Sequence, residues 1–173
     1  AYFTGFGASK RIVFFDTLLA RLSGSEIEAV LAHELGHFKR RHEIKRMVVT
    51  FAISLALLAL LGWLSQRVWC YEGLGVRPSL LGGNEGLARV LFFLAVPVFL
   101  FFVTPLGSLS SRKHEFEADA FAATQTDAQH LVNALVKLYE DNASTLTPDP
   151  LYTAFYYSHP PASQRIDRLL AHA

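Results

Sequence analysis

The sequence predicts a mainly α-helical membrane protein with one short β-hairpin at its N-terminus. Hydrophobic residues make up 51% of the 173 residues, a high share for a soluble domain of this length. Two long apolar stretches hold much of that excess. The net charge is only +1, so we expect no basic surface for nucleic acid and exclude it as a partner. The single cysteine, Cys70, excludes an internal disulfide and a cysteine-rich zinc module.

Residues 1–22 are expected to form the hairpin. Tyr2 to Phe6 and Arg11 to Phe15 are rich in the aromatic and β-branched residues typical of strands, and Gly7-Ala8-Ser9 separates them. The chain begins without Met and without the pattern of a signal peptide. We therefore expect it to be part of a longer protein.

A helix is expected over residues 24–46. Ser23 followed by Glu26 has the form of a capping box. Apolar residues then recur at helical spacing, namely Ile27, Val30, Leu31, Leu35 and Phe38. No proline or glycine cluster stops the pattern before Gly62, so the helix is predicted to continue into the first apolar stretch.

Residues 47–64 and 90–106 are predicted to span a membrane. The first stretch is uncharged and reaches the roughly 18 residues that a transmembrane helix needs. The second is also uncharged but contains Pro97 and Pro105, so a kinked span and a long helix in a soluble core are both open. The glycine-rich residues 65–89 between them predict a loop on the opposite side of the membrane.

Basic residues at the outer ends of these stretches predict their orientation. Lysines and arginines are dense over residues 39–46, and Arg112 and Lys113 follow the second stretch. Because cytoplasmic flanks carry the excess of such residues, both ends are expected in the cytoplasm, at the bacterial inner membrane or the eukaryotic endoplasmic reticulum. An amphipathic helix over 112–139 and a C-terminal segment over 140–173 complete the predicted elements.

His33-Glu34-Leu35-Gly36-His37 is an HExxH motif on the predicted helix. Side chains four positions apart project from the same face, so both imidazoles can bind one zinc ion. A catalytic zinc has three protein ligands and a water, so a third ligand must come from elsewhere. Glu34 is placed to take a proton from the metal-bound water as general base. The motif alone is also compatible with two surface histidines that bind no metal.

The third ligand is expected from a second motif, Glu115-Phe116-Glu117-Ala118-Asp119. Glu115 and Asp119 share one face of the predicted helix. We expect Glu115 to be an oxygen ligand and Asp119 to accept a hydrogen bond from the far nitrogen of a zinc-bound histidine. Glu117 is predicted to face away. One zinc ion is expected per chain.

The remaining histidines are expected to be structural or solvated. His42 lies nine positions from His33, on the opposite face of a continuous helix. His114 is expected to point away from the second motif, and His130 and His172 are expected to have no partners.

Five ordered strings resemble the type I CaaX prenyl endopeptidases, a family of integral-membrane zinc metalloproteases. They are Ala1 to Gly7, Lys10 to Leu19, Ala29 to Phe38, Glu115 to Ala122, and His159-Pro160-Pro161 followed by Arg165. The resemblance implies a gluzincin-like catalytic domain over residues 1–173, with further spans upstream in full-length members. It implies the same zinc ligands and general base that the motifs indicate.

The resemblance also implies three further roles. Tyr2, Phe3, Thr4 and Gly5 look like the family's edge strand, which pairs with the backbone of a peptide substrate. The HPP segment borders the active site in this family. His159 is therefore a candidate to polarise the scissile carbonyl or oxyanion, and Arg165 a candidate to orient the neighbouring acids.

The leading hypothesis is a zinc endopeptidase in a lipid bilayer that cleaves prenylated CaaX-type or other membrane-delivered peptides. The alternative enzyme is an HtpX-like quality-control protease, which shares the zinc motifs. A non-catalytic membrane scaffold is the alternative from a different class. Glu34 argues against the scaffold, because a structural zinc site needs no base and usually has four protein ligands. The substrate, and whether it must be prenylated, stay open.

Overall fold

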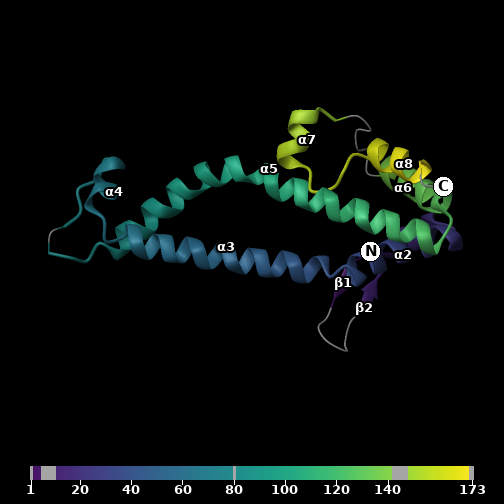
Figure 1. Ribbon diagram of the computed structural model, residues 1–173, viewed down its shortest axis with the longest axis horizontal. Coiled ribbons are helices and arrows are strands. Elements are labelled where there is room, and N and C mark those ends of the chain that lie inside the picture. The colour runs from purple at the N-terminus through teal and green to yellow at the C-terminus, as the bar shows by residue number, and fades with distance from the viewer. Residues whose placement is uncertain (1, 5–10, 80, 142–147, 172–173) are drawn as a thin grey trace. The chain divides into compact units, whose positions relative to one another are not determined.

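The computed structural model describes residues 2–4, 11–79, 81–141 and 148–171. The chain is mainly helical, in agreement with the predicted fold class, and Figure 1 labels most of its elements. Its contacts divide the predicted single domain into two compact units. The first unit comprises residues 1–43 and 105–173, and the second comprises residues 44–104.

The N-terminal hairpin is present but shorter than predicted. Strand β1 (Tyr2–Thr4) pairs antiparallel with β2 (Arg11–Val13), with Phe3 opposite Ile12. The second strand stops before Phe15 because helix α1 (Asp16–Arg21) begins there. Asp16 lies in the first turn of this helix and Arg21 in its last turn, which is the charge arrangement that the helix dipole favours. Gly5 and the predicted turn lie outside the described residues.

Helix α2 (Gly24–Lys39) begins with the predicted capping box. The Ser23 hydroxyl accepts a hydrogen bond from the Glu26 backbone at 3.4 Å, and the Glu26 carboxylate accepts one from the Ser23 backbone at 2.7 Å. The same carboxylate forms a 2.8 Å ion pair with Lys137 of α6 (Ala128–Asp141). The start of the HExxH helix is therefore tied to another helix of the same unit.

The prediction that this helix continues through residue 46 is wrong. Helix α2 ends at Lys39, Arg41 adopts a left-handed φ of 55°, and helix α3 (His42–Leu64) begins at the next residue. The left-handed region is normally occupied by glycine or asparagine, and the sequence has neither here. The local sequence therefore contained no signal for this break.

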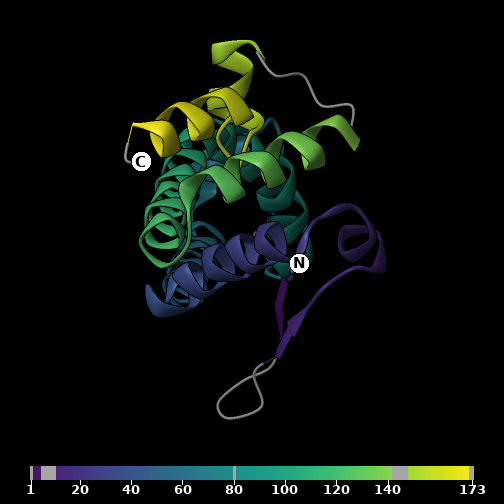
Figure 2. The ribbon, with the colours of Figure 1, turned by 90° about the vertical axis from the view of Figure 1, so that its right-hand side faces the viewer.

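Helix α6 lies between α2 and α8 (Ala162–Leu170) in the first unit (Figure 2). The three helices enclose an apolar core that includes Val30, Leu131, Leu135 and Leu169. The predicted single helix over 112–139 is wrong, because helix α5 (Glu85–Gln125) ends before Asp127. The Asp127 carboxylate accepts a hydrogen bond from the Gln129 backbone at 2.8 Å, which is the pattern of a new helix start.

Within the C-terminal segment, α7 (Pro150–Tyr156) is anchored to the polar end of α5. Asp149 caps this helix, with its carboxylate accepting from the Tyr152 backbone at 2.9 Å. Arg112 donates to the carbonyls of Thr153 and Tyr157 at 2.8 and 3.1 Å. These contacts fix the chain that leads to the HPP segment.

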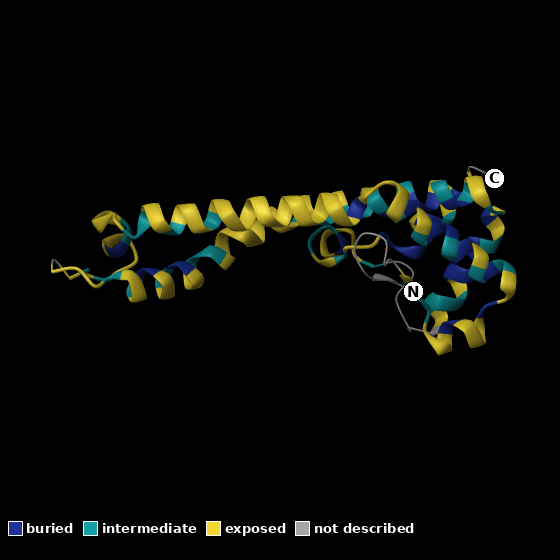
Figure 3. Cartoon of the chain, turned by 90° about the horizontal axis from the view of Figure 1, so that it is seen from below, coloured by how far each residue is buried: buried dark blue, intermediate teal, exposed yellow. Residues whose placement is uncertain are grey.

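The second unit contains the two apolar helices. Helices α3 and α5 are long and apolar enough to cross a membrane, and α5 continues through Pro97 and Pro105. Almost none of the residues in their most apolar 18-residue stretches is buried (Figure 3), whereas the central helix of a soluble protein would be covered. This exposure favours membrane spans over a soluble core. The predicted loop over 65–89 contains helix α4 (Val68–Gly73).

Candidate metal centre and active site

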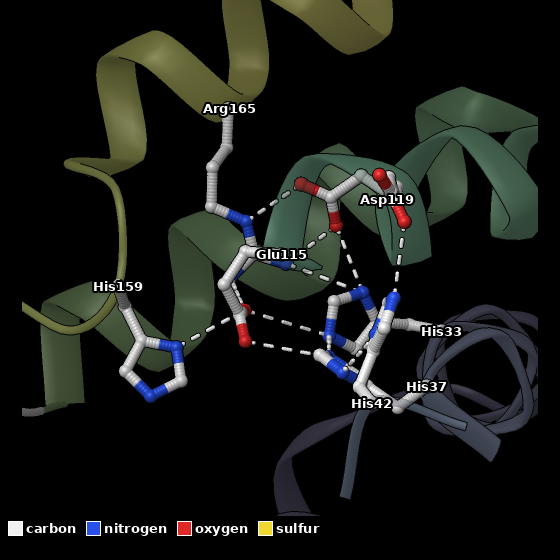
Figure 4. A network of polar contacts seen from close by, with 8 residues as sticks. His33, His37, His42, Glu115, Asp119, His159 and Arg165 are labelled. Carbon is white, nitrogen blue, oxygen red and sulfur yellow. Dashed lines mark hydrogen bonds and ion pairs between the residues drawn. The ribbon is translucent and has the colours of Figure 1, made fainter. Parts of the chain in front are cut away.

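Helices α2 and α5 bring together the three predicted metal ligands. The nearest ring nitrogens of His33 and His37 and a carboxylate oxygen of Glu115 all lie within 4.8 Å of one another. His37 Nε2 is 3.3 Å from Glu115 Oε1 and 3.2 Å from His33 Nε2, and His33 Nε2 is 3.7 Å from Glu115 Oε2 (Figure 4). Ligands of a tetrahedral zinc lie about 3.3 Å apart, given bonds of about 2.0–2.1 Å. The donor types and their spacing therefore fit zinc.

Gly36 permits this close approach of α2 to α5. A Cβ atom at this position would lie 3.0 Å from Ala118 Cα, 3.1 Å from the Ala118 carbonyl oxygen and 3.2 Å from Phe121 Cβ. These distances are shorter than an ordinary van der Waals contact. A larger residue at position 36 would therefore require Ala118 or Phe121 to move by a few tenths of an ångström.

Asp119 and Arg165 lie behind His33. The Nδ1 atom of His33 is 2.8 Å from Asp119 Oδ1, which leaves Nε2 to face the metal position. Arg165 comes from α8, is almost fully buried, and donates to both Asp119 carboxylate oxygens, with Nε to Oδ2 at 2.8 Å. Burial raises the pKa of Asp119, but hydrogen bonds from His33 and Arg165 hold it below its usual value. The carboxylate is therefore kept ionised.

His159 reaches the site from the HPP segment. Its Nδ1 atom is 3.0 Å from Glu115 Oε2, and its side chain is 64% exposed. The hydrogen bond with Glu115 raises the pKa of this imidazole. Tyr139 of α6 donates to the Pro160 carbonyl at 3.3 Å, which holds the segment in place. An exposed imidazole beside a buried ligand is suitably placed to meet a substrate.

The remaining predicted site residues are Glu34 and the residues of the N-terminal strand. Glu34 is partly buried on α2, and its negative charge is near enough to contribute to the raised pKa of His159. Tyr2, Phe3 and Thr4 form β1. Among the described residues, no strand pairs with the edge of β1 that faces away from β2.

His42 is where the sequence-based expectation fails. It was expected on the face opposite to His33, but it is 3% exposed and its Nδ1 lies 3.0 Å from Nδ1 of His37. Its Nε2 lies 3.1 Å from Glu117 Oε2, so Glu117 has a partner within the site. The cause is the break at Arg41, after which periodicity along α2 no longer applies. No glycine, proline or asparagine there could have revealed it.

The remaining histidines differ in their surroundings. The ring of His114 stacks on that of His42, with centroids 4.1 Å apart and an angle of 11° between the planes. His114 is therefore part of the packing around the site. His130 is half-buried on α6, and His172 lies outside the described residues.

An HExxH helix that faces a glutamate of a second helix, with an aspartate behind the first histidine, is an arrangement typical of metallopeptidases. The model of peptidase family M48 matches residues 1–173. The chain belongs to this family. Membership implies a bound metal, typically zinc, and it confirms the predicted resemblance to CaaX prenyl endopeptidases at the level of the family.

Curated relatives support this assignment. The chain is 35% identical to CAAX prenyl protease 1 of Saccharomyces cerevisiae, over 98% of this chain and 40% of the relative. It is 38% identical to the CAAX prenyl protease 1 homolog of Arabidopsis thaliana, over 96% of this chain and 38% of the relative. The crystal structure of S. mikatae Ste24p matches with a TM-score of 0.83 and 34% identity, over 97% of this chain and 42% of that one. The chain thus spans about two fifths of these proteins.

Proposed function

We propose that this chain forms the catalytic centre of a zinc-dependent membrane endopeptidase. The observation that carries the proposal is the convergence of His33, His37 and Glu115, with ligand atoms within 4.8 Å of one another. Three protein ligands leave one position for water, whereas structural zinc sites usually have four protein ligands. This difference favours an enzyme over a non-catalytic scaffold.

A zinc ion held by these ligands would lower the pKa of a water molecule and polarise the scissile carbonyl. Glu34 accepts the proton of the attacking water on its carboxylate and returns it to the leaving amine. His159 donates a hydrogen bond to the carbonyl oxygen as negative charge develops there. Asp119 and Arg165 hold His33 in orientation from behind.

The proposed substrates are prenylated CaaX-type peptides or other peptides delivered by the membrane. Two features support this class: the relatives are named CAAX prenyl proteases, and two exposed apolar helices suit a lipid bilayer. The peptide backbone would pair with residues 2–5, since β1 has an edge open to strand addition among the described residues. Both the zinc site and this strand would lie on the cytoplasmic side.

The test compares Glu34→Gln with wild type in the full-length protein purified in detergent. The variant keeps shape and metal ligands but loses the proton acceptor, so it should keep one zinc per chain and lose about 10²- to 10⁴-fold in kcat. Glu28→Gln, an exposed glutamate of the same helix, is the matched control. Wild-type turnover in Glu34→Gln would reject Glu34 as the base, and wild-type protein without zinc would reject the proposed site.

Matched CaaX peptides with and without a farnesyl group then test the substrate. We expect both to be bound through their backbone and the farnesylated peptide to be cleaved with the higher kcat/KM. Equal cleavage of both peptides would show that the enzyme accepts membrane-delivered peptides without regard to the lipid.

A further inference from the structure

A hydrogen-bonded chain of three side chains extends from His37 away from the metal position. The Nδ1 atom of His37 faces Nδ1 of His42 at 3.0 Å, and Nε2 of His42 faces Glu117 Oε2 at 3.1 Å. Figure 4 shows His42 beside His37. We propose that His42 and Glu117 position His37 for metal binding by fixing which of its ring nitrogens carries the proton, an inference that rests on the proposed zinc site.

The direction of the hydrogen bonds follows from the carboxylate of Glu117, the last group of this chain of contacts. An ionised carboxylate only accepts, so Glu117 requires the proton of His42 on Nε2. A neutral histidine has one N–H, which leaves His42 Nδ1 as an acceptor. His37 must then donate from Nδ1, and its Nε2 lone pair is free. That lone pair is the one located 3.3 Å from Glu115 and 3.2 Å from His33.

In this proposal each of the two histidine ligands donates from Nδ1 toward an acid, and its Nε2 is left to face the metal. His33 donates directly to Asp119 at 2.8 Å, whereas His37 donates to an acid through an intervening imidazole. Outer partners of this kind fix the tautomer and ring orientation of a metal-bound histidine. Three carboxylates of one helix are used: Glu115 as ligand, Glu117 and Asp119 as outer partners.

The surroundings of His42 fit a positioning role. The residue is 3% exposed, both of its ring nitrogens have partners, and the His114 ring stacks on it at 4.1 Å. It also follows directly on Arg41, whose left-handed φ of 55° is unfavourable for a residue with a Cβ atom. The turn between α2 and α3 brings His42 back to His37, which a continuous helix would not allow.

The first test measures zinc affinity by competition with a chelator in the full-length protein. His42→Leu keeps an apolar side chain but removes both hydrogen bonds, so zinc should bind about 10- to 100-fold more weakly. His42→Asn should recover part of the loss, because its Oδ1 can accept from His37 Nδ1. His130→Leu, on α6, is the control and should bind zinc as wild type does. Equal losses of zinc affinity in His42→Leu and His42→Asn would show that His42 contributes only by packing, which would overturn the proposal.

The second test removes the charge at the far end of the chain. In Glu117→Gln the amide can also donate to His42, which permits the opposite tautomer of His37, so zinc affinity should again fall. Glu140→Gln, an exposed glutamate of α6, is the matched control. If His42→Leu does not fold, Glu117→Gln tests the proposal in its place. A zinc affinity equal to wild type in Glu117→Gln would then overturn the proposal. A wild-type protein that binds no zinc would instead reject the proposed function.

Discussion

At the scale of single residues, the centre depends on how each ligand is held from behind. Arg165 neutralises Asp119, and Asp119 in turn accepts from His33. Both partners of this pair are buried, so each would leave an uncompensated charge if the other were lost. A change that keeps the shape of Asp119 but removes its charge is therefore more informative than a truncation.

Asp119→Asn is expected to weaken zinc binding about 10- to 100-fold, the usual effect of removing an outer partner. The amide oxygen can still accept from His33, but the charge that favours the correct tautomer is gone. Excess zinc should restore most of the activity, because the groups that touch substrate are unchanged. Chelator competition and activity at increasing zinc would check this, with Asp167→Asn on the exposed face of α8 as control. Zinc affinity equal to wild type would contradict the role of Asp119.

At the scale of helices, the centre depends on the close packing of α2 on α5 and on the anchoring of α2 to α6. Gly36 permits the first contact, since a methyl group there would lie closer to Ala118 and Phe121 than an ordinary van der Waals contact allows. The ion pair between Glu26 and Lys137 contributes to the second. Each of these contacts can be changed without touching a metal ligand.

Gly36→Ala should destabilise the protein by about 1–3 kcal/mol, the typical effect of forcing an extra methyl group into a packed contact. Because α2 must move away from Ala118, zinc affinity should fall as well. Gly24→Ala is the control, since nothing lies within 4 Å of that position and alanine favours a helix. Thermal unfolding and zinc titration of both variants measure the effect. An unchanged Tm and zinc affinity in Gly36→Ala would show that the helices adjust freely.

The capping glutamate predicts a dependence of stability on pH. The hydrogen bond from Lys137, together with that from Ser23, lowers the pKa of Glu26 below its usual value. A lowered folded-state pKa stabilises the protein above the unfolded-state pKa of about 4.3, and this contribution is lost as pH falls through the folded-state value. Between pH 6 and pH 3, Tm of the metal-free protein should therefore fall more steeply in wild type than in Glu26→Gln. Glu28→Gln, at an exposed position, should show the same dependence of Tm on pH as wild type. If Tm changed with pH equally in all three proteins, Glu26 would not contribute to this pH dependence.

At the scale of the whole molecule, the chemistry and the apolar surface are in different units. All three candidate metal ligands belong to residues 1–43 and 105–173, whereas residues 44–104 contain most of the exposed apolar surface of α3 and α5. The basic residues that flank the two apolar stretches predict that the candidate zinc site faces the cytoplasm.

A cysteine at position 40 tests this orientation. In a Cys70→Ser background, Arg40→Cys should react with an impermeant thiol reagent only when the cytoplasmic face is accessible. The native Cys70, on α4 between the two apolar stretches, should label from the opposite side. Labelling of position 40 only from outside in intact cells would show that the orientation is reversed.

The sequence by itself determined what depends on neighbouring residues. The spacing of His33 and His37 places both rings on one face of a helix, the pair Ser23 and Glu26 predicts the helix start, and the apolar stretches predict the spans by their length alone. Each of these features follows from local backbone geometry or from composition, so no knowledge of distant contacts is needed.

The resemblance implied that Arg165 orients the neighbouring acids, but only the tertiary structure decided its partner and brought His42 to the site. Arg165 reaches Asp119 across 46 positions, and His42 reaches Glu117 across 75. The breaks at Arg41 and before Asp127 were also missed. Neither has a glycine or a proline, and the one local signal at the second break is the capping residue Asp127 itself. A left-handed arginine is unfavourable on its own, and we infer that the burial and hydrogen bonds of His42 offset its cost. Such a balance between local strain and distant contacts exists only in the folded chain.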